Sequence, residues 1–168
     1  MIIWIASYPK SGNTWVRSFL TAYYFCENGV FNIDKLSLIE DYPNKQFFRE
    51  TVKQGEIHNH WDSSQKDICD QKKAKFLKTH NSLITAFGND FTKPKYSLGV
   101  IYVIRDPRNV ITSVKNHNDL ESYEKALKFM QDENKVLEDY PHLKNYAKTN
   151  IVNSWRINYQ SWMSNKNF

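Results

Sequence analysis

The beginning of the chain is its most constraining feature, because a short apolar run leads through a polar, glycine-containing loop into an amphipathic segment. Residues Ile2–Ala6 are rich in β-branched side chains, as is typical of a buried strand. The loop 7–13 follows, and the segment from Thr14 to about Cys26 has the apolar spacing of a helix. This order of strand, loop and helix is the first part of an α/β unit.

The alternation of strands and helices continues along the chain. We expect a second strand over 75–79 and a third over 98–104, which has the strongest apolar run of the chain. Continuous apolar strands of this kind are typical of a sheet that is covered on both faces. A chain of 168 residues is long enough to bury roughly 70% of its unfolded surface around one core. We therefore predict a three-layer α/β fold with a parallel sheet, in a single domain spanning residues 1–168.

Three further helices are expected in the second half of the chain. Asp106 is a suitable cap for a helix that begins at Pro107, where the missing N–H costs nothing, and runs to about Asn116. The patterns also predict helices over 122–138 and from about 142 to 164, separated by Tyr140-Pro141.

Residues 27–75 are mostly polar and aromatic, and we interpret them as a substrate-facing insertion with short helical patterns over 33–40 and 47–54. The aromatic run 23–25 is expected on the buried face of the first helix. Four aromatic side chains are candidates for the lining of an apolar acceptor pocket: Tyr8, Phe47, Phe48 and Trp61.

Segment 7–15 reads Ser-Tyr-Pro-Lys-Ser-Gly-Asn-Thr-Trp. Free backbone N–H groups and the positive end of a helix dipole favour an anion at such a loop, Gly12 permits close approach of the backbone, and Lys10 adds a full charge. The alternative interpretation is a tight polar turn before an ordinary helix. The Lys precedes the Gly, so the spacing differs from the Walker pattern of nucleotide kinases.

The pattern Tyr-Pro-Lys-Ser-Gly-x-Thr-Trp resembles the 5′-phosphosulfate loop of sulfotransferases, which move a sulfuryl group from 3′-phosphoadenosine 5′-phosphosulfate (PAPS) to an acceptor. Residues 76–80, Phe-Leu-Lys-Thr-His, are similar to the family's segment with the catalytic histidine. Residues 101–113 resemble its 3′-phosphate segment, with Arg105 at a strand end and Ser113 eight residues later. Residues 153–162 resemble a late helix of the family, so the likeness covers nearly the whole chain.

This resemblance implies a P-loop-like sheet, PAPS as co-substrate, and transfer to a hydroxyl or amine of a small-molecule or glycan acceptor. The chemistry of the side chains agrees, because an imidazole can accept the proton of a hydroxyl and a lysine can stabilise charge on a leaving phosphate. The expected catalytic residues are His80, Lys10, Lys78 and Ser113. The expected donor-binding residues are Lys10, Ser11, Gly12, Asn13, Thr14, Trp15, Arg105 and Ser113, with Trp15 stacked on the adenine.

We expect no metal, because lysine and arginine can neutralise the charge that Mg²⁺ neutralises in kinases. The cluster His58-Asn59-His60-x-Asp62 is the candidate metal site, and we interpret it as a polar loop or a wall of the acceptor pocket. Two alternatives to an active sulfotransferase stay open. One is a P-loop kinase that uses ATP and Mg²⁺, and the other is a non-catalytic nucleotide-binding remnant.

Composition limits the partners. The net charge of +5 comes from scattered lysines. A nucleic-acid-binding protein needs a clustered basic face, and the sequence shows none, so we expect no nucleic-acid partner. No apolar run reaches the ~20 residues of a membrane helix, and the start lacks a basic leader, so we expect a cytoplasmic protein without a membrane partner. Chains of the resembling family continue past the equivalent of Phe168, so we expect a C-terminally incomplete member.

Overall fold

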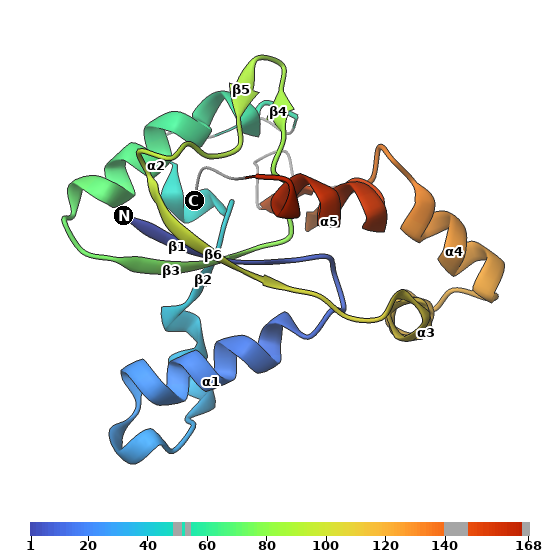
Figure 1. Ribbon diagram of the computed structural model, residues 1–168, viewed down its shortest axis with the longest axis horizontal. Helices are drawn as coiled ribbons and strands as arrows, with labels where there is room; N and C mark the ends of the chain where they lie inside the picture. Colours follow the sequence, from blue (N-terminus) through green and yellow to red (C-terminus); the bar gives the residue numbers. More distant parts are fainter. Residues whose placement is uncertain (49–51, 53–54, 140–147, 166–168) are drawn as a thin grey trace.

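The computed structural model describes residues 1–48, 52, 55–139 and 148–165. Its centre is a four-stranded parallel sheet with the strand order β2-β3-β1-β6 (Figure 1). The strands are Glu40–Asp41 (β2), Lys75–Thr79 (β3), Ile2–Ser7 (β1) and Ser97–Val103 (β6). The strands predicted over 2–6, 75–79 and 98–104 are therefore confirmed to within one residue.

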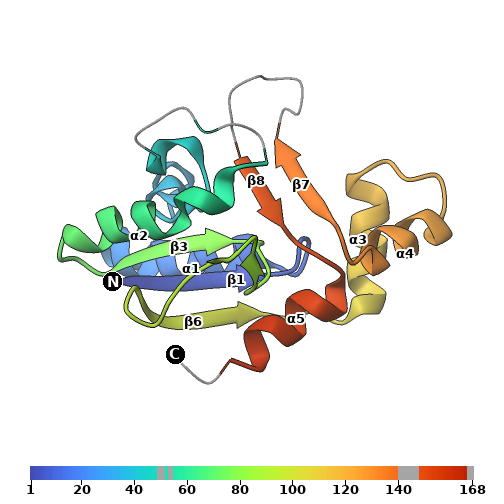
Figure 2. The same ribbon diagram turned by 90° about the horizontal axis from the view of Figure 1, so that it is seen from above.

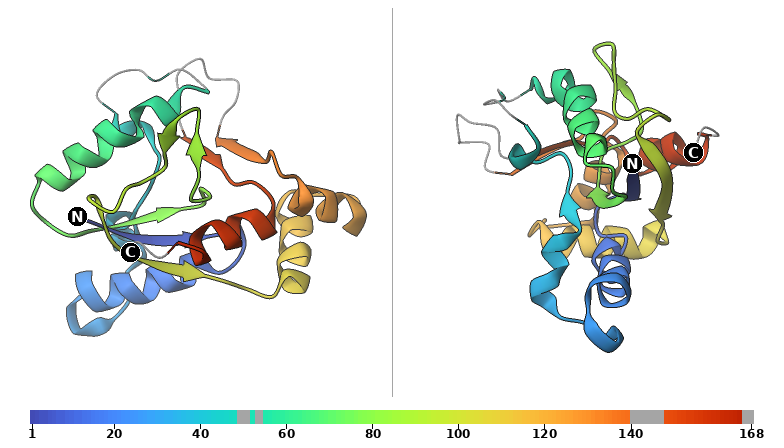
Figure 3. Two further views of the ribbon diagram at one scale, coloured as in Figure 1. Left: turned by 45° about the horizontal axis from the view of Figure 1, so that its top comes forward. Right: turned by 90° about the vertical axis from the view of Figure 1, so that its left-hand side faces the viewer.

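Helices cover both faces of this sheet. Helix α1 (Asn13–Phe25) lies on one face, and α2 (Trp61–Asp70) and α5 (Trp155–Met163) lie on the other (Figures 1 and 3). Trp4 of β1 is fully buried against the second face, in a cluster that includes Trp61 and Trp162. The protein is thus the three-layer, P-loop-like α/β domain that the sequence predicts.

A second group of elements lies beyond the carboxyl ends of the strands. Helices α3 (Pro107–His117) and α4 (Tyr123–Gln131) pack together around Val110, Val114 and Ala126. The antiparallel hairpin of β7 (Val136–Asp139) and β8 (Lys148–Ile151) stands between these helices and the α2 side of the molecule (Figure 2). The remaining short elements are β4 (Thr85–Ala86), β5 (Asn89–Asp90), η1 (Glu27–Gly29), η2 (Ile33–Leu38), η3 (Lys45–Phe47) and η4 (Ile57–His60).

The two long helices predicted over 122–138 and 142–164 are wrong in extent. Helix α4 ends at Gln131 because the carboxylate of Asp132 accepts the backbone N–H of Asn134 at 3.0 Å, which forms a turn in place of another helical turn. Helix α5 starts only at Trp155, because Ser154 caps it by accepting the N–H of Ile157. The predicted separator Tyr140-Pro141 lies outside the described residues.

Two expectations about burial are also wrong. Tyr23 and Tyr24 are 78% and 57% exposed, so the aromatic run of α1 does not form its buried face. Strand β6 is the end strand of the described sheet, and its Leu98 and Ile101 side chains are exposed, so helices do not cover this strand fully. The pattern predicted over 33–40 corresponds to η2, and most of the pattern over 47–54 lies outside the described residues.

Among the α-helices of the described residues, α2 alone was not predicted from the sequence. None of the helices in the described ranges is long and apolar enough to cross a membrane.

Candidate active site

The loop between β1 and α1 turns sharply through two left-handed residues. Lys10 has a φ of 67° and Gly12 a φ of 100°, and Gly12 occupies the N-cap position of α1. No side chain in the described part of the chain caps this helix, and its first turn carries no acidic residue. The positive end of α1 is therefore not neutralised locally, which favours an anion at the loop.

The loop after β6 faces the first loop. Asp106 caps α3 by accepting the N–H of Arg108 at 2.8 Å, and Pro107 occupies the first turn as predicted. The side chain of Arg108 returns to Asp106 in a 2.6 Å ion pair, and the hydrogen bonds from Arg108 lower the pKa of the Asp106 carboxyl. Arg105 instead donates from Nη1 to the carbonyl oxygen of Lys10 at 3.4 Å. The two loops are thus in direct contact.

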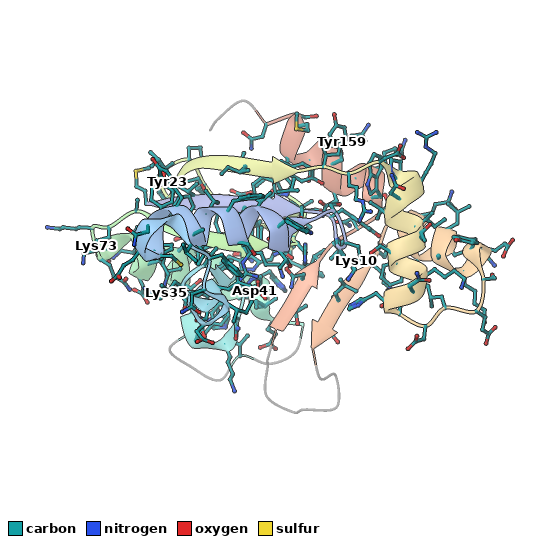
Figure 4. The ribbon with its side chains drawn as sticks, turned by 90° about the horizontal axis from the view of Figure 1, so that it is seen from below. Lys10, Tyr23, Lys35, Asp41, Lys73 and Tyr159 are labelled. Carbon is teal, nitrogen blue, oxygen red and sulfur yellow. The ribbon has the colours of Figure 1, made fainter. Side chains whose placement is uncertain are left out.

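One cavity of about 640 Å³ opens between these loops, the end of β3 and the β7–β8 hairpin. Figure 4 shows Lys10 on the loop that enters this region, at the end of α1 opposite Tyr23. The residues predicted for the site that line the cavity are Lys10, Gly12, Asn13, Thr14, Trp15, Lys78, His80, Arg105 and Ser113. Ser11 is not among its lining residues, and the Ser11 side chain is buried.

His80 follows β3 and is anchored through its ring and through its backbone. Nδ1 lies 2.8 Å from the carbonyl oxygen of Ser7 and 3.2 Å from Ser7 Oγ. A carbonyl oxygen can only accept, so Nδ1 carries the proton and Nε2 of the neutral ring carries the lone pair. The backbone N–H of His80 donates to Asn150 Oδ1 at 3.2 Å, and its carbonyl oxygen accepts from Asn158 Nδ2 at 3.0 Å.

The side chain of Asn13 holds Ser7, the residue that contacts the His80 ring. The side-chain amide of Asn13 donates to the carbonyl oxygen of Ile5 at 3.0 Å and to Ser7 Oγ at 3.1 Å. The Asn13 amide nitrogen is therefore directed at β1, so the backbone N–H is the donor through which Asn13 can serve an anion. Ser7 links this amide to the His80 ring.

Lys78 lines the cavity from β3 and forms an ion pair with Asp41 of the neighbouring strand, with 3.0 Å between Nζ and Oδ1. Arg17 Nη1 lies 3.7 Å from the same Asp41 oxygen. Burial lowers the pKa of the Arg17 guanidinium, and the Asp41 charge opposes this shift. Asp41 therefore contacts two cations, of which Lys78 lines the cavity.

The comparison with protein families agrees with this geometry. A family model described as "Sulfotransferase domain" matches residues 2–167. The chain belongs to the sulfotransferase family. A search of curated proteins finds no match for this sulfotransferase.

Several cavity residues of this sulfotransferase were not found from the sequence. His117 lies one helical turn after Ser113 on α3, and the i,i+4 spacing was a usable signal. Asn150, Leu137 and Glu138 come from the β7–β8 hairpin, which the sequence analysis assigned to helices. The hydrogen bond from His80 to Asn150 could therefore not be predicted, because residue 150 was expected in a helix.

The candidate metal cluster has other partners. Asp62 binds Lys93 at 2.6 Å and accepts from the Tyr96 hydroxyl at 3.0 Å, and the His58 ring packs on Phe87. Within the described ranges, no three histidine, cysteine or acidic side chains are grouped so as to hold a metal ion.

Proposed function

We propose that this sulfotransferase moves the sulfuryl group of PAPS to a hydroxyl or amine of a small-molecule or glycan acceptor. The observation that carries the proposal is that Lys10, Arg105 and His80 come from three separate loops and line the same cavity. A donor with phosphate at two positions needs two cationic anchors, and a hydroxyl acceptor needs a base beside them.

The residues present fit the donor. Lys10 and the N–H groups at the start of α1 suit the phosphosulfate, while Arg105 and Ser113 suit the 3′-phosphate. His117 also lines the α3 side of the cavity, where its ring can donate a further hydrogen bond to the 3′-phosphate. The Trp15 ring is 73% exposed at the cavity edge, which leaves its face open for stacking on an adenine.

The orientation of His80 supports a role as general base. With Nδ1–H held by the Ser7 carbonyl, Nε2 accepts the proton of the acceptor hydroxyl as its oxygen forms a bond to sulfur. The bond between sulfur and the bridging oxygen breaks, and its electron pair stays on the phosphate, where Lys10 neutralises the charge. Such proton transfer accelerates reactions typically by about 10²–10⁴-fold. We place Lys78 at the transferring group, with Asp41 setting where its ammonium lies.

Calorimetric titration with 3′-phosphoadenosine 5′-phosphate (PAP) tests the donor site. We expect binding without metal and a preference over ATP with Mg²⁺, weakened by Lys10→Ala and by Arg105→Ala. Arg108→Ala is the matched control, because this nearby arginine is paired with Asp106 and does not line the cavity. Equal or tighter binding of ATP with Mg²⁺ would contradict the proposal and favour a kinase. PAP binding without any transfer from PAPS would favour a non-catalytic remnant.

A further inference from the structure

The inner face of α1 carries polar side chains where a surface helix usually has an apolar stripe. Asn13 and Thr21 are the buried residues of this helix, and Arg17 lies midway between them at i,i+4 spacing. The Arg17 side chain is only 13% exposed. Asn13 holds Ser7, the residue that contacts the His80 ring. Arg17 is the next residue along the same face, one turn further from the donor loop.

Arg17 attaches the segment between η2 and β2 to helix α1. Its Nη2 donates to the carbonyl oxygens of Leu36 at 3.1 Å and Ile39 at 2.6 Å. Its Nη1 lies 3.7 Å from Oδ1 of Asp41, the second residue of β2. Because the guanidinium is planar and rigid, two bonds to main-chain oxygens fix its orientation. Asp41 therefore lies beside a cation that is held in one place.

The charge of Arg17 keeps the Asp41 carboxylate close to α1. A cation that is largely removed from water is unfavourable unless a counter-charge lies near it. The Asp41 charge supplies this compensation, since it opposes the lowering of the Arg17 pKa by burial. Figure 4 shows Asp41 next to α1, in agreement with this ion pair.

The Asp41 carboxylate also contacts Lys78, across two neighbouring strands. The ladder of β2 and β3 pairs Asp41 with Lys78, and the N–H of Tyr42 donates to the Lys78 carbonyl at 2.8 Å. Residues in register share a face of the sheet, and Lys78 Nζ lies 3.0 Å from Asp41 Oδ1. Lys78 lines the donor cavity. Arg17, Asp41 and Lys78 thus form a row from α1 to the cavity wall.

Strand β2 carries a second ion pair that serves as a comparison. Glu40 precedes Asp41 and pairs with Lys75, and adjacent residues of a strand point to opposite faces. The two carboxylates have similar exposure, 28% for Glu40 and 24% for Asp41. Within the part of the chain that the structure describes, Lys78 lines the donor cavity, and neither Glu40 nor Lys75 does.

We infer that Arg17 is a positioning residue for sulfuryl transfer: it fixes the Asp41 carboxylate, which in turn sets where the Lys78 ammonium lies. This inference rests on the proposed function, in which Lys78 contacts the transferring group. An ammonium has three donors, so Lys78 can bind Asp41 and a sulfuryl oxygen at the same time. The lysine side chain is long and flexible, and holding its charge in the productive place lowers the cost of reaching the transition state.

The test compares two ligands of the full chain that differ in the sulfuryl group, PAPS and PAP, by calorimetry without acceptor. The readout is the ratio of the dissociation constant for PAPS to that for PAP. The ratio cancels the effect of removing a charge near both nucleotides, and it also cancels a general loss of structure. Lys78→Met should raise this ratio about tenfold or more, the equivalent of a hydrogen bond to a charged group.

Variants of the two supporting residues should raise the same ratio. We expect about a fivefold rise or more for Asp41→Asn, which keeps the size of the side chain, and for Arg17→Met. Arg17→Lys keeps the charge without the planar fork, so it should fold and raise the ratio about twofold or more. PAP affinity should stay within about twofold of wild type in all of them. Glu40→Gln is the matched control and should leave both dissociation constants unchanged.

A double-mutant cycle shows whether Asp41 acts through Lys78. In the Lys78→Met background, Asp41→Asn should leave the ratio unchanged, because the side chain that it positions is gone. An equal rise with and without Lys78 overturns the inference. A ratio equal to wild type in Lys78→Met, in Asp41→Asn or in both Arg17 variants also overturns it, and PAP binding then leaves the donor site standing. Failure of PAP to bind the wild type overturns the proposed function as well.

Discussion

Arg105 Nη1 donates to the Lys10 carbonyl oxygen at 3.4 Å, which joins two loops that are 95 residues apart in sequence. Each loop follows a parallel strand, and β1 and β6 are neighbours in the sheet. Because the carboxyl ends of parallel strands meet at one edge, the two proposed phosphate anchors lie side by side. The contact uses only one nitrogen of the Arg105 fork, and guanidinium groups bind phosphate through two.

Arg105→Lys tests whether this fork is required. Arg105→Ala should weaken PAP binding roughly 10- to 100-fold, the equivalent of a charged hydrogen bond of about 1.5–3 kcal/mol. Arg105→Lys should recover only part of this loss, because an ammonium lacks the planar pair of donors. Calorimetry measures both variants. Full recovery with lysine would show that charge alone is sufficient.

Asn13→Ala tests the support beneath His80. The change removes both hydrogen bonds of the Asn13 amide and leaves the buried Ile5 carbonyl with one partner fewer. We expect a loss of about 1–3 kcal/mol in the free energy of unfolding. We also expect kcat to fall more than KM changes, because Ser7 contacts the His80 ring. Urea denaturation and steady-state kinetics measure the two effects.

The control for Asn13→Ala is Ser37→Ala, an exposed change on η2. It should cost less than about 0.5 kcal/mol. If kcat is unchanged in a folded Asn13→Ala protein, Asn13 has only a structural role.

Asp62→Asn tests a pH-dependent contribution to stability. The hydrogen bond from Lys93 lowers the pKa of Asp62, against the smaller effect of burial. A carboxyl with a lowered folded-state pKa stabilises the protein above its unfolded pKa of about 3.9, and this contribution is lost as the pH falls through the folded-state pKa. The wild type should therefore exceed Asp62→Asn in stability near pH 7 and converge with it below about pH 4.

At neutral pH the free energies of unfolding of wild type and Asp62→Asn should differ by less than about 1 kcal/mol. The Asp62 side chain is 46% exposed, so water screens its ion pair with Lys93. Thermal unfolding at several pH values measures this difference. A gap that widens in acid would contradict the assigned direction of the pKa shift.

Phe91→Ala tests the aromatic core on the α2 face. Phe91 is fully buried, and its ring centroid lies 5.2 Å from those of both Trp4 and Trp61. Removing the ring should cost about 3–5 kcal/mol through lost burial and the remaining cavity. Urea denaturation followed by tryptophan fluorescence measures the loss. A cost under about 1 kcal/mol would mean that neighbouring rings refill the space.

The parts of the fold that could be predicted are those with local signals. Strands β1, β3 and β6 are short apolar runs, and α3 has its cap and its proline next to each other in sequence. That the candidate residues Lys10, His80 and Arg105 line one cavity could be predicted for the same reason, since each follows one of these strands. Their meeting then follows from the order of a parallel sheet.

The parts that could not be predicted depend on contacts distant in sequence. Helix α2 buries Ser64 and Gln65 towards the core, where Gln65 Nε2 donates to the Phe91 carbonyl. Because polar residues occupy the buried face of α2, its sequence lacks the regular apolar spacing by which a helix is predicted. The β7–β8 hairpin likewise depends on pairing with residues 80–82, and Val136 and Leu137 fit a strand as well as a helix.

We propose that His80 takes the acceptor proton while Lys10 and Arg105 hold a single PAPS molecule. The most direct measurement is transfer of radiolabelled sulfur from PAPS to the hydroxyl of a probe acceptor, 2-naphthol, by the wild type and by His80→Ala, with PAP affinity measured in parallel. We predict transfer by the wild type, a loss of about 10²–10⁴-fold in His80→Ala, and PAP affinity within about twofold of wild type. Equal transfer by the two proteins would contradict the account.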